Sequence, residues 1–96
     1  MRIIYLSNFF NHHQKPLADE LYGILGDDYT FVETWDGIPF EQKVLGYHTY
    51  DVPYVKKYSE EKKRIDQMIL DADIVIYGEA PLSLIKKRIL SRKLTI

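Results

Sequence analysis

The chain has 96 residues, of which 46% are hydrophobic and 14% aromatic, and its formal net charge is -1. This is enough apolar material for the core of one small domain, so the composition excludes a disordered or fibrous protein. There is no cysteine, which excludes disulfides and thiolate metal sites and favours a reducing cytoplasm. No apolar run approaches the roughly 18 residues that a membrane span needs, and no secretory pattern begins the chain.

The first predicted element is a strand over residues 2–7, RIIYLS, whose near-continuous apolar run is typical of a strand buried on both faces. An amphipathic helix is predicted next, ended by Gly26. Pro16 must lie in its first turn, because deeper in the helix it would remove a backbone hydrogen bond. We therefore expect Asn11 or a neighbour as the cap. The apolar side of this helix is formed by Leu17, Leu21, Ile24 and Leu25.

The middle of the chain contains one clear strand and weaker signals. Residues 29–34, YTFVET, are rich in aromatic and β-branched side chains and follow a turn-forming pair of aspartates, which predicts a second strand. A short helix over residues 39–45, closed by Gly46, and a brief edge strand over residues 52–57 are expected in the irregular stretch that follows.

The last third alternates between helix and strand signals. Ser59 followed by acidic residues predicts a capped helix start, and its buried stripe is formed by Ile65, Met68, Ile69 and Ala72. Residues 73–78, DIVIYG, predict a second interior strand. Pro81 then opens a further helix, with one face formed by Leu82, Ile85 and Ile89. Residues 94–96 read as the beginning of one more strand.

This order of elements predicts an α/β fold: a Rossmann-like three-layer αβα domain with a mostly parallel sheet, formed by residues 1–96. Right-handed crossovers place the strands that begin at residues 2 and 73 side by side at its centre. In such sheets the ligand binds beyond the carboxyl ends of the strands, where the strand order reverses. The predicted ligand-binding residues there are Ser7, Asn8, Phe9, Asn11, Glu79 and Ala80.

The adjacent His12 and His13 are the candidates for catalysis, because imidazole titrates near neutral pH and can act as a general base or bind a hydroxyl or phosphate. The alternative is that they are polar surface residues. A metal site is not expected, since consecutive side chains diverge and no carboxylate stands at ligand spacing. Phe9 and Phe10 either stack on a ligand or pack beneath neighbouring loops, and the aromatic residues of segment 35–54 either contact a ligand or hold that loop down.

Several motifs are absent from the sequence. No G-x-G-x-x-G follows the first strand and no P-loop signature occurs, so neither a dinucleotide cofactor nor an NTPase is expected. Basic residues are not interleaved with stacking aromatics, which disfavours nucleic-acid binding. After Glu79 the charged residues are all basic: Lys86, Lys87, Arg88, Arg92 and Lys93. They form either a solvated helix face or a patch for an anionic membrane or phosphorylated ligand.

The segments MRIIYLSNFFNHHQKPLADELY, YTFVET, LGYHTYDVPYV and DADIVIYGEAP running into LIKKR resemble the N-terminal domain of bacterial glycosyltransferases with two Rossmann domains, the GT-B architecture. More narrowly, the chain is similar to a group of family 4 retaining glycosyltransferases of Gram-positive bacteria. The resemblance covers essentially the whole chain, and its most specific part is the run from Asn11 to Pro16. Ser7-Asn8 stands where these enzymes commonly have small residues that approach the donor diphosphate.

The resemblance implies that this domain binds a sugar acceptor, either a glycan or a lipid-linked sugar, while a missing C-terminal domain binds a nucleotide-sugar donor. The chain is then expected to be truncated before that domain and inactive by itself, without a cofactor, in the cytoplasm or at the inner face of the membrane. An open sheet edge leaves a homodimer as an option. The alternative from another class is a non-catalytic Rossmann-like binding or interaction module, complete as it stands.

Overall fold

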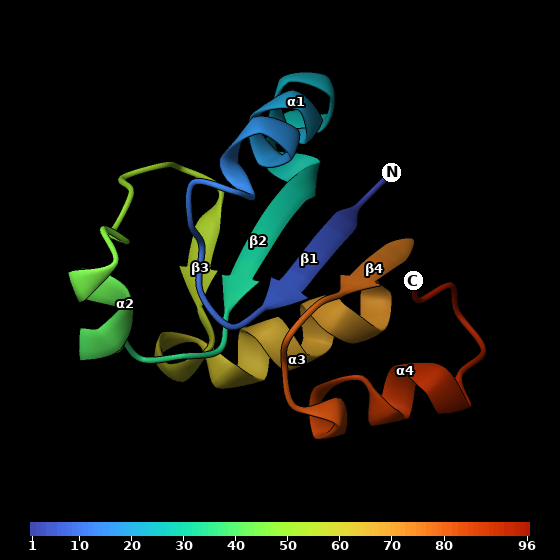
Figure 1. Cartoon of the computed structure of the whole chain (residues 1–96). Helices are drawn as coiled ribbons and strands as arrows, with labels where there is room; N and C mark the ends of the chain where they lie inside the picture. Colours follow the sequence, from blue (N-terminus) through green and yellow to red (C-terminus); the bar gives the residue numbers. More distant parts are fainter.

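A parallel four-stranded sheet forms the centre of the computed structural model, which describes residues 1–96 (Figure 1). Strand β1 (Ile3–Ser7) lies between β2 (Tyr29–Glu33) and β4 (Ile74–Tyr77), and the short β3 (Val55–Lys57) pairs with the outer side of β2. The order is therefore β3-β2-β1-β4. The predicted α/β fold is confirmed, with every strand pair parallel, and β1 and β4 are neighbours as expected. The central strands are β1 and β2, however, because β4 is the last strand in this order rather than a central one.

Helices cover both faces of this sheet, which gives the predicted three layers (Figure 1). Helix α1 (Lys15–Leu25) covers one face, and α3 (Lys62–Asp71) and α4 (Lys86–Leu90) cover the other. The short α2 (Phe40–Val44) lies in the connection between β2 and β3. None of these helices has the length and the apolar character that crossing a lipid bilayer requires.

Alternate residues of the central strands enter two separate cores. On the α3 side, Ile4 and Leu6 of β1 pack with Ile65 and Ile69 of α3. On the α1 side, the core is mainly aromatic, and its buried members are Phe10, Ala18, Tyr29, Phe31 and Tyr54. Tyr54 comes from the connection before β3, and Tyr50 of the same segment packs against this core. These aromatic side chains therefore hold the long segment after β2 against the sheet, which was one of the two expectations for them.

Helix α1 begins and ends near the predicted positions, but its buried side differs. Pro16 lies in the first turn and Gly26, with φ of 57°, ends the helix. The residue at the N-cap position is Gln14 rather than Asn11. Leu17 and Ile24 are exposed, and the only fully buried side chain is Ala18. Leu21 and Leu25 are partly buried and pack against the aromatic core, so half of the predicted apolar side faces the sheet.

Two further helix starts were predicted in the wrong place. Ser59 lies in a 3-10 turn (Tyr58–Glu60), and the residue before α3 is Glu61, so the serine hydroxyl does not cap the helix. Pro81 precedes another 3-10 turn (Leu82–Leu84), and α4 begins only at Lys86. The three residues predicted to share one helix face therefore differ in environment: Ile85 is buried, whereas Leu82 and Ile89 are exposed.

The C-terminal residues run beside β4, as expected of the beginning of a strand. The Ile96 amide donates to the carbonyl of Val75 at 2.8 Å, and the Tyr77 amide donates to the carbonyl of Ile96 at 2.7 Å. The pairing is parallel, with Thr95 opposite Val75. The sheet thus continues beyond β4 by one short segment.

Arg88 departs from the interpretation of the C-terminal basic residues as a solvated helix face or an anion-binding patch, whereas Lys86, Lys87, Arg92 and Lys93 are exposed. Its side chain is only 1% exposed. The guanidinium donates hydrogen bonds to the carbonyls of Ile69, Ala72, Asp73 and Leu94 and to the hydroxyl of Thr95. The negative end of the α3 dipole lies at these carbonyls. Burial lowers the pKa of Arg88 below its usual value, and the charge of Asp73 opposes that shift.

Candidate functional site

The carboxyl ends of β1 and β4 approach each other very closely. The Gly78 amide donates to the carbonyl of Leu6 at 2.7 Å. A Cβ added at Gly78 would lie 3.0 Å from Ser7 Oγ and 3.1 Å from the carbonyl oxygen of Leu6. Only glycine fits this approach without displacing backbone, so the close contact of the two strand ends depends on the residue type at position 78.

Beyond this contact, the loops that follow β1 and β4 are joined by side chains. Asn8 Nδ2 donates to Glu79 Oε2 at 2.9 Å. The amide oxygen of Asn8 accepts hydrogen bonds from the Phe9 backbone at 2.7 Å and from Ser7 Oγ at 3.3 Å. The Glu79 backbone in turn donates to Ser7 Oγ at 3.3 Å. Both side chains of the Asn8–Glu79 pair are therefore held by the local network rather than free to rotate.

Two hollows open on either side of the Asn8–Glu79 pair, and together we call them the β1/β4 crevice. One has a volume of about 360 Å³ and is bordered by Thr34, Trp35, Ala80 and Pro81. The other, of about 370 Å³, is bordered by residues of the β1–α1 loop and by Gln42 and Tyr47. Asn8 and Glu79 line both hollows. The crevice lies where the strand order reverses, at the arrowheads of β1 and β4 in Figure 1.

The six predicted ligand-binding residues all border this crevice. The larger hollow is lined by Ser7, Asn8, Phe9, Asn11 and Glu79, and the smaller one by Asn8, Glu79 and Ala80. The Ala80 carbonyl accepts a hydrogen bond from the Tyr77 hydroxyl, which fixes the turn after β4. The sequence therefore located the place at which the fold brings polar groups from two distant segments together.

The two histidines lie outside the crevice. His12 and His13 are exposed, line neither hollow, and contact each other with ring centroids 4.0 Å apart. Tyr47, which does line the larger hollow, lies against both rings, with centroid distances of 5.0 Å to His12 and 6.0 Å to His13. The catalytic role expected of His12 or His13 stays a prediction.

The two phenylalanines of the β1–α1 loop pack within the protein. Phe9 is buried and stacks on Trp35 with ring centroids 5.3 Å apart and an interplanar angle of 15°. Phe10 is buried against Phe31, Tyr50 and Tyr54. The packing alternative therefore describes both residues, and the exposed aromatic ring at the crevice is that of Trp35, which is 39% exposed.

The last residue of β2, Glu33, and the residue after it, Thr34, also contribute to this edge, although neither was among the predicted site residues. The Thr34 hydroxyl donates to the carbonyl of Ser7 at 3.0 Å, and Glu33 Oε2 accepts a hydrogen bond from the Phe10 amide at 2.8 Å. The signal that could have found them is that carboxyl ends of neighbouring parallel strands share one edge. Glu33 and Thr34 end the predicted second strand, so they belong to that edge.

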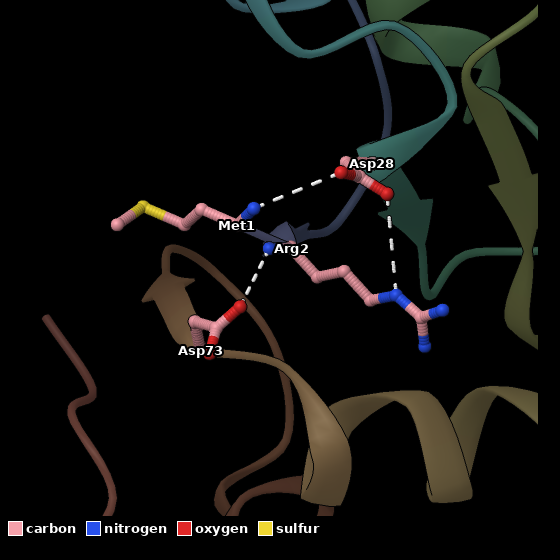
Figure 2. Close-up of polar contacts among 4 residues, drawn as sticks. All are labelled: Met1, Arg2, Asp28 and Asp73. Atoms are coloured by element: carbon pink, nitrogen blue, oxygen red, sulfur yellow. Dashed lines mark hydrogen bonds and ion pairs between the residues drawn. The ribbon is translucent and has the colours of Figure 1, made fainter.

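The largest hollow lies at the opposite edge of the sheet. Its volume is about 580 Å³, and Arg2, Asp28, Arg64 and Asp71 are among the residues that line it. Figure 2 shows the polar contacts at this edge. The carboxylate of Asp28 lies 3.7 Å from the Met1 amino group and 4.0 Å from Arg2 Nε. The Asp73 carboxylate accepts a hydrogen bond of 2.7 Å from the Arg2 backbone amide. These ion pairs are exposed, and such pairs contribute little to stability. The charges of Arg2 and Asp28 are thus paired with groups of the chain itself.

None of the protein-family models, curated proteins or solved structures compared with this chain matches it. The geometry of the β1/β4 crevice and the resemblance seen in the sequence are therefore the grounds for a functional proposal.

Proposed function

We propose that the chain is the acceptor-binding N-terminal domain of a GT-B glycosyltransferase and that a sugar acceptor binds in the β1/β4 crevice. The observation that carries the proposal is the Asn8–Glu79 hydrogen bond at the strand ends, with a hollow on each side. A nucleotide-sugar donor would be bound by a second domain. The cysteine-free sequence fits a reaction in the cytoplasm.

The chemistry of the crevice supports a ligand rich in hydroxyl groups. A carboxylate accepts hydrogen bonds from neighbouring hydroxyls, and amide side chains both donate and accept them. Glu79 and Asn8 supply these groups at the centre, and Gln42 adds another amide at the border. Trp35 in one hollow and Tyr47 in the other provide partly exposed aromatic rings, and such rings suit the apolar C–H faces of sugars.

The positions of the titratable side chains favour Glu79 over the two histidines as the group that contacts an acceptor in the crevice. Glu79 touches both hollows, whereas His12 and His13 touch neither. A general base has to come within hydrogen-bond reach of the proton that it abstracts, either directly or through one water molecule. Glu79 meets that requirement for an acceptor in the crevice better than either histidine does.

The second candidate function is a stand-alone, non-catalytic binding module. It is favoured by the Asn8–Glu79 hydrogen bond, which joins the two loops of the crevice within this one domain. The encoding reading frame distinguishes the two candidates. Continuation past codon 96 into a second α/β domain supports the glycosyltransferase, and a stop codon there supports the module.

Binding is tested by two-dimensional amide NMR of the 96-residue chain titrated with glucose, galactose, mannose and N-acetylglucosamine. We expect at least one of these sugars to shift the amides of Asn8 and Glu79 and the indole signal of Trp35. Glu79→Ala should weaken that response, while Glu41→Ala, which removes an exposed carboxylate on α2, should not. No shift with any sugar at tens of millimolar, or shifts confined to the Arg2–Asp28 edge, would contradict the proposal.

A further inference from the structure

We infer that the β1/β4 crevice accepts uncharged or amine-bearing sugar rings and rejects phosphorylated ones. The inference rests on the proposed function of the crevice as a sugar site and adds the class of sugar that the site selects. It follows from two independent features: the charges that line the hollows, and the hydrogen bonds already made by the backbone amides of the β1–α1 loop.

The first feature is the absence of any cation in the lining. Glu79 is the only charged residue that borders the two hollows, and no Lys, Arg or His borders either of them. The remaining polar residues are the neutral side chains Tyr5, Ser7, Asn8, Thr34 and Tyr47 and the amides of Asn11, Gln14 and Gln42. Glu79 also forms no ion pair. A phosphate in either hollow would therefore meet an unneutralised carboxylate.

The second feature concerns the amides that a phosphate would need. Free N–H groups at the start of a helix are a common anion site. In the β1–α1 loop, however, the Phe10 amide donates to the carboxylate of Glu33 at 2.8 Å, and the Phe9 amide donates to Asn8 Oδ1 at 2.7 Å. Within the protein the anion position at Phe10 is thus already filled by a carboxylate.

The amides that continue into α1 are also taken. The Asn11 amide donates to Gln14 Oε1 at 3.2 Å, and the His13 amide donates to Asn11 Oδ1 at 2.9 Å. The amides of Gln14 and Lys15 both donate to the carbonyl of Asn11. From Phe9 to Lys15, only the His12 amide has no partner within the chain. A single donor cannot replace the cradle of several amides that binds a phosphate.

Two lysines adjoin lining residues in the sequence, Lys15 next to Gln14 and Lys43 next to Gln42, but neither borders the hollows. Lys15 Nζ is bound to Asp19 Oδ2 at 2.7 Å on the side of α1, and Lys43 is exposed on α2. Arg88 is buried and bonded to carbonyl groups on the α3 side of the sheet. A lipid-linked acceptor would consequently have to present an unphosphorylated ring, with its phosphate groups outside the crevice.

The test compares matched pairs by NMR titration of the 96-residue chain at an ionic strength of about 20 mM, where screening is weak. The pairs are glucose with glucose 6-phosphate, mannose with mannose 6-phosphate, and N-acetylglucosamine with its 6-phosphate. Each neutral sugar that binds should bind at least about 5-fold more tightly than its phosphate, and glucosamine at least as tightly as glucose. A change of this size is what a few-ångström repulsion at a partly exposed site produces.

The variant Glu79→Gln keeps an oxygen that accepts the Asn8 hydrogen bond but removes the charge. It should therefore reduce the difference in affinity between the sugar and its phosphate. Glu41→Gln is the matched control and should leave this difference in affinity unchanged. This inference would be overturned, with a sugar site left in place, if the sugar phosphates bound as tightly as the neutral sugars or more tightly. It would also be overturned if Glu79→Gln did not alter the difference in affinity. If no sugar of either kind binds, the proposed function fails together with the inference.

Discussion

Arg88 Nη1 donates a hydrogen bond of 2.6 Å to the carbonyl oxygen of Ala72, at the point where α3 ends and β4 is about to begin. The same guanidinium donates through Nη2 to the carbonyl of Leu94, also at 2.6 Å. One buried side chain therefore connects the end of a helix on the sheet with the segment beside the edge strand. A buried cation is costly unless its donors are bonded, and each nitrogen of this one has at least one acceptor.

Replacing Arg88 with Met should lower the free energy of unfolding by about 2–4 kcal/mol, because several buried carbonyls lose their partner at once. Lys86→Met is the matched control on the same helix, where the side chain is exposed, and should change stability by no more than about 0.5 kcal/mol. Urea denaturation followed by circular dichroism measures both. Equal effects of the two substitutions would show that the guanidinium bonds carry no stability.

Gly78→Ala should lower the free energy of unfolding by about 1–3 kcal/mol, since the added Cβ would press on Ser7 Oγ and on the backbone of β1. Gly23→Ala is the contrasting substitution. Gly23 lies inside α1, and an added Cβ there meets nothing within 4 Å, so Ala should raise stability by about 0.5–1 kcal/mol. Thermal unfolding of the two variants should move in opposite directions, and a Gly78→Ala protein as stable as the parent would refute the close approach.

Tyr29→Phe should leave stability at neutral pH unchanged or raise it by up to about 2 kcal/mol, because the buried Tyr29 hydroxyl has no hydrogen-bond partner. Tyr54→Phe should instead lower stability by about 1 kcal/mol, because its hydroxyl donates to Asp19 at 2.8 Å. Chemical denaturation at pH 7 compares the two variants. A clear loss on removing the Tyr29 hydroxyl would mean that it does have a partner.

The buried hydroxyl of Tyr29 should also make the stability of the protein decrease at alkaline pH. Burial raises the pKa of Tyr29 above its usual value, and the neighbouring Tyr5 adds to the shift. Stability that depends on the neutral phenol is fully present below the unfolded-state pKa of about 10 and is lost as the pH rises above it. Between pH 9 and pH 11 the parent protein should lose more stability than Tyr29→Phe, as measured by urea denaturation. Identical losses would contradict the prediction.

The hydrogen-bonded carboxylate of Asp19 should make the stability of the protein decrease at acidic pH. Hydrogen bonds from Lys15 and from Tyr54 lower the pKa of Asp19. The stability that this contributes is present above the unfolded-state pKa of about 3.9 and is lost as the pH falls through the lower pKa of the folded protein. Asp19→Asn should therefore show a smaller decrease of stability than the parent between about pH 5 and pH 2. Asp36→Asn, which removes an exposed carboxylate without these partners, should not.

The pairing of β1 with β4 could be predicted from the sequence because both are runs of apolar residues of the kind that parallel sheets contain. Once those strands lie side by side, the crossover rule places their loops at one edge, and Asn8 and Glu79 meet there although 71 positions separate them. These consequences depend on the periodicity of the chain and not on the details of side-chain packing. That β4 is the outer strand of the four was not predicted.

The helix ends and the fate of single charged residues could not be predicted in the same way. Ser59 has the residue type of a cap, but a 3-10 turn brings Glu61 to the position before α3. Arg88 stands among exposed basic residues in the sequence, and only the convergence of α3, β4 and the C-terminal segment surrounds it with carbonyls. Local preference is outweighed at both places by contacts between distant segments.

The hydrogen bond from Asn8 to Glu79 fixes the carboxylate before any ligand arrives. Oε2 accepts the Asn8 amide at 2.9 Å, but a carboxylate offers about four acceptor sites on its two oxygens. A ligand hydroxyl can therefore bind Glu79 while the Asn8 hydrogen bond stays in place. Because the carboxylate is already oriented, less side-chain freedom is lost when the ligand binds.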